Sequence, residues 1–301
     1  MDHEQIITRA AALNSCTGTG TGKQESESDA EERWRLIGEL HRSTGRDAFE
    51  AVLAAAASDE PARRLVALDA LGQIGYATGR PYAEETLPVL IGAAGDDDAR
   101  VVASAVTALG HVGDARALPA VLRQVGHASD EVRFAAAVAL PSLTGADEPG
   151  AVVAEGTGAA VTEALIALTR DPDPEVRDWA TFGLGTQLDA DGPEIREALA
   201  ARLDDDYDQA AEEAVAGLAR RGDPRAAAAL LDQLRQLADD DSILPGTLLF
   251  ELAAASPTTD ALPLLRRLWQ RRNDFEPAAR QRLAEAIEAH TAGSPDLDRE
   301  S

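Results

Sequence analysis

Apolar and small residues recur at helical spacing in residues 173–185, which read Asp-Pro-Glu-Val-Arg-Asp-Trp-Ala-Thr-Phe-Gly-Leu-Gly. If Arg177 is counted as position zero, Val176, Ala180 and Leu184 occupy positions minus one, three and seven. A helix turns by about 100° per residue, so these three positions share one face. The stretch therefore predicts an amphipathic helix that packs this face into a core.

The same pattern returns along almost the whole chain, with a small or apolar residue at position three and an aliphatic one at position seven. The zero positions are Arg33, Arg64, Val102, Arg133, Arg177, Ala211, Pro245 and Arg280. They are spaced by 31 to 44 residues, and shorter amphipathic segments such as 161–168 and 226–237 lie between them. Helix pairs repeated at this period are typical of a solenoid. The sequence thus predicts an all-α fold, a right-handed α-α superhelix of about eight helix pairs.

Each predicted second helix is preceded by a turn residue, four positions before zero, that is suited to cap it. These residues are Asp29, Glu60, Asp98, Ser129, Asp173, Tyr207, Asp241 and Glu276. Side-chain oxygens accept hydrogen bonds from the free N–H groups at a helix start, where negative charge is also favoured. We expect all of them except Tyr207 to act as caps. The acidic turns therefore have a structural explanation and need no catalytic one.

The repeated pattern Asp-Pro-Glu-Val-Arg-x-x-Ala-x-x-Ala-Leu-Gly resembles the HEAT-like repeats first recognised in phycobilisome lyases. The resemblance covers roughly residues 29–290 and is strongest in 173–185. In such repeats the arginine pairs with an acid of a neighbouring turn, so the resemblance implies a ladder between repeats. Its members would be Arg33, Arg64, Arg133, Arg177 and Arg280. Val102, Ala211 and Pro245 would break it.

Three segments fall outside the repeats. Residues 1–28 hold a possible first helix and a flexible linker rich in glycine, serine and glutamate, and residues 291–301 form a polar tail that we expect to be disordered. Residues 146–158 form an insertion that contains glycine and proline. A long loop in a compact array is either a tolerated insertion or a functional loop. The solenoid is therefore predicted over residues 29–290 as one domain.

Charge and cysteine content narrow the classes of partner. The chain has 28 basic and 53 acidic residues, a formal net charge of −25 over 301 residues. Such a field repels nucleic acid and anionic membranes. The single cysteine, Cys16, allows no internal disulfide and favours a reducing cytoplasm. No apolar run of about 20 residues predicts a membrane helix, and the first residues do not resemble a signal peptide.

No stretch has the spacing of a known catalytic or metal-binding motif. The glycine-rich residues 18–23 lack the first glycine and the Ser/Thr of a phosphate-binding loop. The acids of 204–208 lack the glycine and final glutamate of a calcium loop. HEAT-like di-iron hydroxylases use repeated His-Glu pairs, and His3-Glu4 is the one such pair here. We therefore expect a protein that is not an enzyme and that uses no metal and no cofactor.

Two alternatives stay open. The dense basic stretch 266–272 fits a nucleic-acid binder of the HEAT-like glycosylase type, although it also fits the solvated face of a helix. A bilin lyase-like enzyme follows from the family resemblance alone. The acidic composition disfavours both nucleic acid and membranes as partners.

Some positions that should be polar are apolar. Positions one and five of the second helices point away from the core, yet they include Trp34, Leu65, Phe134, Val138, Phe182 and Phe250. We predict that a strip on the concave face binds a protein partner with basic flanks. Its residues are Leu65, Phe134, Val138, Trp179 and Phe182, rimmed by Asp69, Asp178 and Glu212. Alternatively, curvature or the insertion buries them. The predicted function is a monomeric cytoplasmic scaffold for protein–protein interaction.

Overall fold

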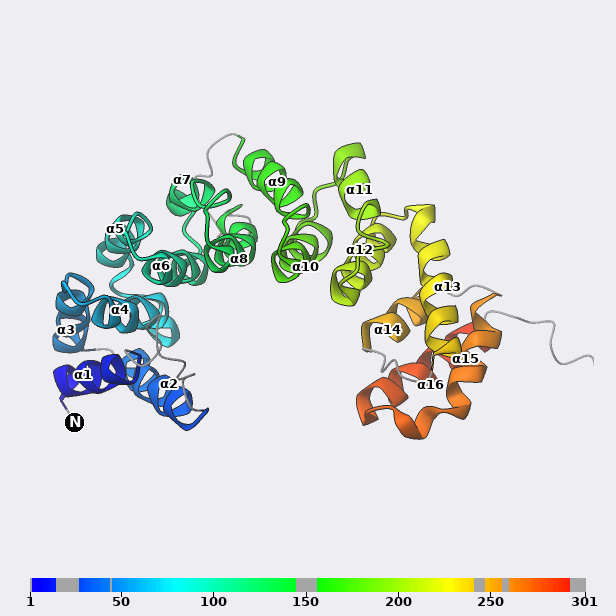
Figure 1. The fold of residues 1–301 in the computed structure, drawn as a ribbon, viewed down its shortest axis with the longest axis horizontal. Coiled ribbons are helices and arrows are strands. Elements are labelled where there is room, and N and C mark those ends of the chain that lie inside the picture. Colours follow the sequence, from blue (N-terminus) through cyan, green and yellow to red (C-terminus); the bar gives the residue numbers. More distant parts are fainter. Residues whose placement is uncertain are drawn as a thin grey trace, which may run out of the picture. The chain divides into compact units, whose positions relative to one another are not determined.

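The computed structural model describes residues 2–14, 27–43, 45–144, 156–240, 247–255 and 260–292. Over these residues it contains sixteen α-helices and no strand, so the all-α prediction is confirmed (Figure 1). The helices follow one another as eight pairs, α1/α2 to α15/α16. Seven of the eight zero positions lie in the second helix of a pair, and Pro245 lies outside the described residues. Most of the predicted linker, insertion and tail lie outside the described residues. Residues 27 and 28 of the predicted linker belong to α2, and residues 291 and 292 of the predicted tail belong to α16.

The chain divides into two compact units, Met1–Leu168 and Thr169–Ser301. The first unit holds α1 to α9 and the second holds α10 to α16. The boundary falls between α9 and α10, the two helices of the fifth pair. The extent of one solenoid domain over residues 29–290 stays a prediction.

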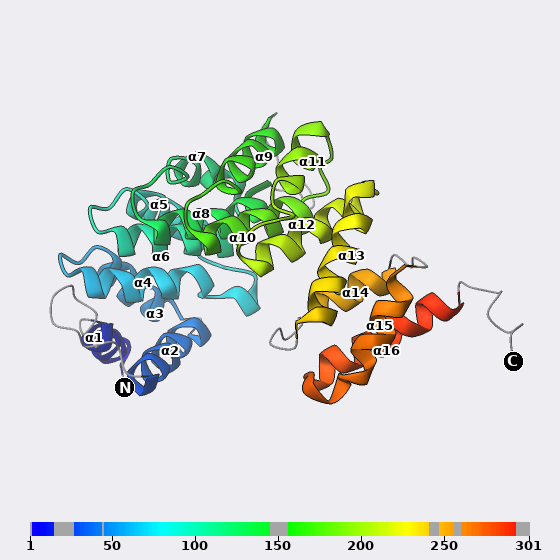
Figure 2. The ribbon, with the colours of Figure 1, turned by 45° about the vertical axis from the view of Figure 1, so that its right-hand side comes forward.

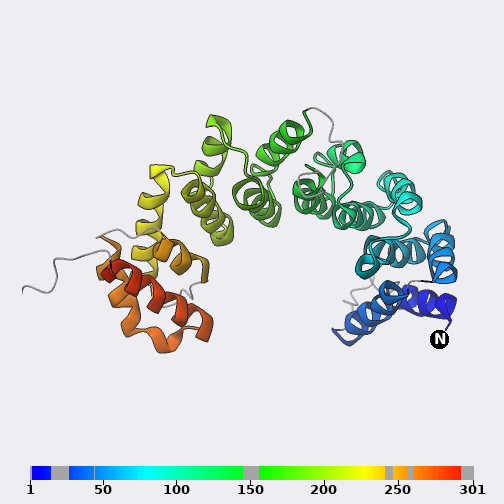
Figure 3. The ribbon, with the colours of Figure 1, turned by 180° about the vertical axis from the view of Figure 1, so that it is seen from behind.

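In the first unit, second helices pack side by side and first helices cover them. The first helices are α1 (His3–Asn14), α3 (Arg46–Ala56), α5 (Ala83–Ala93), α7 (Leu118–Leu122) and α9 (Thr157–Leu168). The second helices are α2 (Glu27–Arg42), α4 (Pro61–Gln73), α6 (Ala99–Val112) and α8 (Asp130–Ala139). Helix α6 packs against both α4 and α8. Figures 1 and 3 show α3, α5 and α7 in one layer and α4, α6 and α8 in the other.

The second unit follows the same scheme. Its helices are α10 (Pro174–Phe182), α11 (Pro193–Ala200), α12 (Asp208–Arg220), α13 (Pro224–Asp239), α14 (Thr247–Ala255), α15 (Ala261–Gln270) and α16 (Pro277–Ala292). Helix α10 packs against α12, and α14 packs against α16 (Figure 2). Helix α13 contacts α12, α14 and α15.

The core lies where the predicted positions meet. Val176, Ala180 and Leu184 of the reference repeat are fully buried. The seventh pair departs from the prediction, because Leu249 and Ala253 are buried there while Leu248 and Leu252 are half-buried. The helical register of α14 therefore lies one residue later than the sequence pattern placed it. For this reason the prediction that Phe250 points away from the core is wrong, and Phe250 is fully buried.

Helix capping follows the prediction in part. Asp98 and Asp173 accept hydrogen bonds from backbone N–H groups at the starts of α6 and α10. Glu60 and Ser129 precede their helices without a side-chain cap bond, so the prediction is wrong for both. It is wrong for Asp29 as well, because α2 begins two residues earlier, at Glu27.

Candidate functional site

The predicted docking residues lie on second helices and differ in exposure. Leu65 of α4 is only 8% exposed and belongs to the core of the first unit. Phe134 and Val138 of α8 are half-buried. On α10, in the second unit, Trp179 is 37% exposed and Phe182 is half-buried. Trp179 is thus the most accessible of the five, and the strip as one continuous surface stays a prediction.

Trp179 and Phe182 contact each other edge to face. Their ring centroids are 5.7 Å apart and their planes make an angle of 89°. Residues three apart on a helix lie on the same side of it, and the edge-to-face arrangement is favoured by the charge distribution of the rings. The two rings form a defined apolar patch at the end of α10.

The chain leaves α10 through one π-helical turn, Gly183–Gln187. At its end, the N–H of Leu188 donates to the carbonyl of Gly183 at 3.1 Å. The turn lies against α12 so closely that a Cβ on Gly185 would be 3.1 Å from the Cα of Gly217. Turns of this kind are rare and frequently occur near functional sites. No sequence pattern predicts this π-helical turn, because glycine is also the usual residue at an ordinary helix end.

Asp178 and Glu212 lie at position one of consecutive second helices, α10 and α12. Both are half-buried, and neither has an ion pair or hydrogen bond with another described side chain. Burial raises the pKa of Asp178 to about 6 and that of Glu212 to about 7, and nearby carboxylates add to both shifts. A desolvated carboxylate without a counter-charge is costly, and such groups gather at functional sites. We call Asp178, Trp179, Phe182 and Glu212 the α10–α12 surface.

Two other acids on the second helices, Glu213 and Asp69, have partners within the chain. Glu213 accepts a hydrogen bond from the hydroxyl of Thr186 at 3.3 Å, although burial still raises its pKa. Asp69, predicted as part of the rim, accepts from the hydroxyl of Ser104 at 2.7 Å and lies 3.5 Å from the guanidinium of Arg33. Burial raises the pKa of Asp69 as well. Asp69 is therefore engaged inside the first unit.

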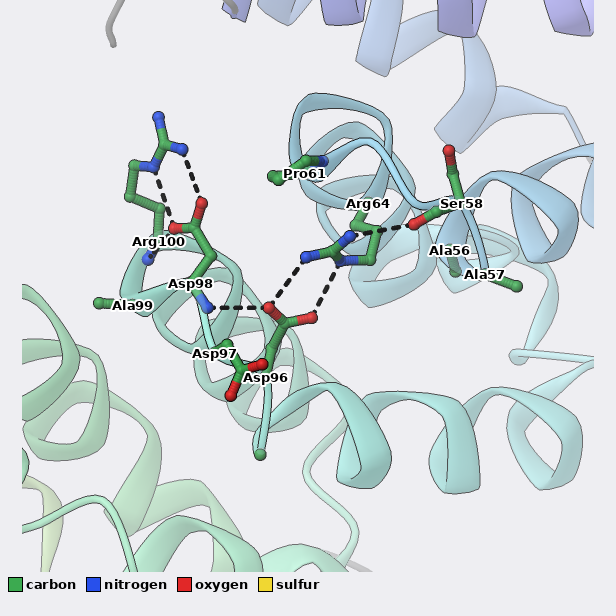
Figure 4. Close-up of a pocket in the computed structure, with 11 residues that line it drawn as sticks. Ala56, Ala57, Ser58, Pro61, Arg64, Asp96, Asp97, Asp98, Ala99 and Arg100 are labelled. Atoms are coloured by element: carbon green, nitrogen blue, oxygen red, sulfur yellow. Dashed lines mark hydrogen bonds and ion pairs between the residues drawn. The ribbon is translucent and has the colours of Figure 1, made fainter. Parts of the chain in front are cut away.

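Arg64 makes contacts of the kind that the ladder prediction describes. Its guanidinium donates to the carbonyls of Ser58 and Asp59 in its own turn, and pairs with Asp96 of the next repeat at 2.9 Å (Figure 4). The carboxylate of Asp96 also accepts from the N–H of Asp98 at 2.9 Å. One arginine thus ties two successive turns together.

The same arrangement recurs at Arg177. Its guanidinium donates to the carbonyls of Asp171 and Pro172 and to the carboxylate of Asp205, at 2.8 and 2.9 Å. Burial alone would raise the pKa of Asp205, but the hydrogen bonds from Arg177 hold it at about 2. The side chain of Asp205 is 1% exposed. Asp205, one of the acids in residues 204–208, is therefore the ladder partner of Arg177.

The three remaining ladder arginines contact an aspartate or backbone carbonyls. Arg33 pairs with Asp69 on the next second helix. Arg133 donates to two carbonyls of its own turn, and Arg280 donates to the carbonyl of Phe275.

A hollow of about 850 Å³ lies beside the Arg64 link (Figure 4). Its charged lining includes Arg64, Asp96, Asp98 and Arg100. Arg100 folds back onto Asp98 at 2.7 Å, and Arg64 is held by Asp96. The fifth charged residue of the lining, Asp97, is exposed. Because the other four charges pair with one another, we interpret the hollow as a feature of the ladder.

The basic stretch 266–272 contacts its own chain. Arg267 pairs with Asp239 at 2.6 Å, and Arg271 donates to the carbonyl of Leu237 at 2.9 Å. Arg272 stacks over the ring of Trp269 at 5.0 Å. These contacts favour the interpretation of the stretch as the outer face of α15.

Within the residues that the structure describes, no group of three or more His, Cys, Asp or Glu side chains is placed to hold a metal ion. None of the described helices is both long enough and apolar enough to span a bilayer.

Comparison with protein families finds a match to the model described as HEAT repeats, over residues 49–141 and 162–241. These two ranges make up more than half of the chain. Among curated proteins, Protein YibA of Escherichia coli K12 is 34% identical over 80 residues, which span 27% of this chain. The alignment covers 28% of the length of that relative.

Solved structures share the fold at low sequence identity. The X-ray structure of Escherichia coli YibA superimposes with a TM-score of 0.63 at 19% identity and covers 97% of both chains. A Kap121p mutant matches with a TM-score of 0.52 at 14% identity, over 95% of this chain and 29% of that one. The CpcE–CpcF complex of phycocyanin lyase from Nostoc sp. PCC7120 matches at 0.43 and 18% identity, over 91% of this chain and 97% of that one.

Proposed function

Because the chain belongs to the HEAT-repeat family, we propose that it is a non-catalytic scaffold that holds a protein partner on its second helices. The proposed partner is an extended segment in which basic and apolar side chains alternate. Stacked helix pairs create extended surfaces that suit this kind of ligand. The α10–α12 surface is the part of the second unit that we assign to it.

The observation that carries this proposal is the pair of unpaired, half-buried carboxylates beside an exposed tryptophan. Asp178 and Glu212 lose hydration in the fold without gaining a cation. An arginine or lysine of a partner would supply the missing charge, and the carboxylates would supply the complementary field. Trp179 and Phe182 would cover an apolar side chain of the same segment.

The charge of the whole chain favours the same partner. A net charge of −25 attracts a basic segment from a distance and accelerates its encounter. The cytoplasm is the compartment that we propose, on the basis of the single cysteine.

Fluorescence anisotropy of two labelled peptides tests the proposal. One peptide alternates arginine and leucine, and the matched peptide carries glutamate in place of arginine. We expect the basic peptide alone to bind, and its affinity to fall with added salt. The double variant Trp179→Ser/Phe182→Ser should raise its Kd at least about tenfold, which corresponds to about 1.4 kcal/mol.

The matched control is Tyr76→Ser, because Tyr76 is an aromatic residue that is 69% exposed and lies outside the α10–α12 surface. It should leave the Kd unchanged. Circular dichroism of both variants separates a lost contact from a lost fold. Equal binding of the acidic peptide, or an unchanged Kd in the folded double variant, would overturn the proposal.

A further inference from the structure

A second concave feature lies beside the α10–α12 surface in the second unit. It is a pocket of about 600 Å³ between the start of α12 and helices α13 and α14. This volume lies within the range of about 300 to 1,000 Å³ that is usual for small-ligand sites. Its lining includes Asp204, Asp208, Glu212, Gln233, Leu237 and Leu249. Glu212 belongs to both the pocket and the α10–α12 surface, so the two are continuous.

The charges around the pocket are unbalanced. Five carboxylates line it and no lysine or arginine does. Two of the five already have partners, since Asp205 is bound by Arg177 and Asp232 by Arg235. Asp204, Asp208 and Glu212 have no ion pair among the described residues. Three carboxylates therefore face the pocket without a counter-charge.

The pocket also has an apolar side and a buried acceptor without a donor. Leu203, Leu237 and Leu249 contribute aliphatic surface to the lining. The Oε1 atom of Gln233 is buried and has no hydrogen-bond partner. A buried acceptor that lacks a donor costs free energy, and a ligand with several N–H groups would remove that cost after a small movement of the amide.

We propose that this pocket binds a guanidinium group, which an arginine side chain of the partner segment would insert between α12 and α13. This proposal rests on the proposed scaffold function, and it requires the partner segment to contain an arginine. The three methylene groups of an arginine side chain would lie along the leucines, as long cationic side chains do on apolar surface. Its five N–H donors, arranged in a planar fork, suit a site that offers several acceptor oxygens in different directions.

Lysine fits the pocket less well. An ammonium is compact, strongly hydrated and has three donors, so it would lose more hydration and satisfy fewer acceptors. We therefore expect the pocket to prefer arginine over lysine. In the peptide assay, replacement of every arginine by lysine should weaken binding several-fold while the charge stays the same.

Small probes test the pocket without the peptide. Butylguanidinium is added to the full chain with ¹³C-labelled leucine methyl groups, and the signals of Leu237 and Leu249 are followed by NMR. We expect saturable shifts with a millimolar Kd, as is usual for so small a ligand. Butylurea has nearly the same shape without the charge and should cause none. The double variant Asp208→Asn/Glu212→Gln should abolish the shifts.

The variant Trp179→Ser/Phe182→Ser separates this inference from the scaffold function. It should lose the peptide but keep butylguanidinium, because the aromatic pair does not line the pocket. If butylguanidinium binds and the peptide does not bind at all, the result supports the guanidinium pocket and contradicts the proposed scaffold function. Equal shifts with butylurea, or shifts that survive in Asp208→Asn/Glu212→Gln, would overturn the guanidinium assignment and leave the scaffold in place.

Discussion

At the scale of single residues, Arg221 has the densest set of contacts in the second unit. Its side chain is 5% exposed, and burial lowers its pKa. The guanidinium donates at 2.7 to 3.1 Å to the carbonyls of Leu184, Gly185, Leu188, Ala190 and Gly217. These carbonyls belong to the π turn, the loop after it and α12, where helical partners are missing. Arg221 therefore holds the turn that ends α10.

We expect Arg221→Met to lower the free energy of unfolding by about 3 kcal/mol or more, because several buried carbonyls lose a charged donor at once. Arg220→Met is the matched control. Arg220 pairs with Asp189, and both are largely exposed, so its loss should cost less than about 1 kcal/mol. Urea denaturation of both variants measures the difference. Similar midpoints would show that Arg221 does not hold the turn.

Because of Glu212, we expect the free energy of unfolding to depend on pH. Its pKa rises from 4.5 to about 7 on folding, chiefly through burial. The folded state therefore binds the proton more tightly than the unfolded state between these two values. Protonation of Glu212 makes its full contribution to the free energy of unfolding below about pH 4.5. This contribution is lost as the pH rises towards 7.

Replacement of Glu212 by glutamine removes that loss. We expect Glu212→Gln to be neutral near pH 4.5 and to stabilise the protein by about 1 to 2 kcal/mol at pH 8, after allowance for solvent screening. The exposed Glu31→Gln should show no such trend. Urea denaturation at the two pH values tests this. A stabilisation that is the same at both would exclude a titrating Glu212 as its cause.

At the scale of helices, the close approach of second helices depends on glycine. A Cβ on Gly110 of α6 would lie 2.8 Å from the Cβ and 2.9 Å from the Cα of Ala139, at the end of α8. Contacts this short require the two helices to separate. By contrast, Gly92 of α5 has nothing within 4 Å of its virtual Cβ.

The same substitution should therefore have opposite effects at the two positions. Gly110→Ala should destabilise the protein by about 1 to 3 kcal/mol through overpacking. Gly92→Ala should stabilise it by roughly 0.5 to 1 kcal/mol, because alanine favours the helix. Thermal and urea unfolding of both variants give the comparison. If Gly110→Ala proved neutral, the α6–α8 contact would be looser than its geometry indicates.

The positions of the helices can be predicted from the sequence wherever apolar residues recur at a clear helical spacing. Residues 161–168 and 226–237 were expected to be helical and lie within α9 and α13. The register of α14 was misplaced by one residue, because leucine at both 248 and 249 fits the pattern equally well. Only packing against α16 and α13 decides which of two adjacent leucines is buried. The π turn after α10 likewise depends on the contact between Gly185 and Gly217.

At the scale of the whole molecule, two compact units share one repeated architecture and a strongly acidic composition. In such arrays each repeat contacts mainly its neighbours, so stability is close to a sum of repeats and the interfaces between them. The Arg64–Asp96 and Arg177–Asp205 links strengthen two of those interfaces. Asp178 and Glu212 are not part of these links and have no counter-charge among the described residues.

The sequence by itself determined the helical fold, the number of repeats and the ladder role of Arg64 and Arg177. These depend on periodic burial and on short turns, which are local in the chain and repeat many times. The candidate site depended on tertiary structure. Leu65 and Phe182 occupy positions one and five of their helices, yet Leu65 is core and Phe182 joins Trp179 in a patch. Whether such a residue is covered depends on how closely the next helix packs, and no local pattern encodes that distance.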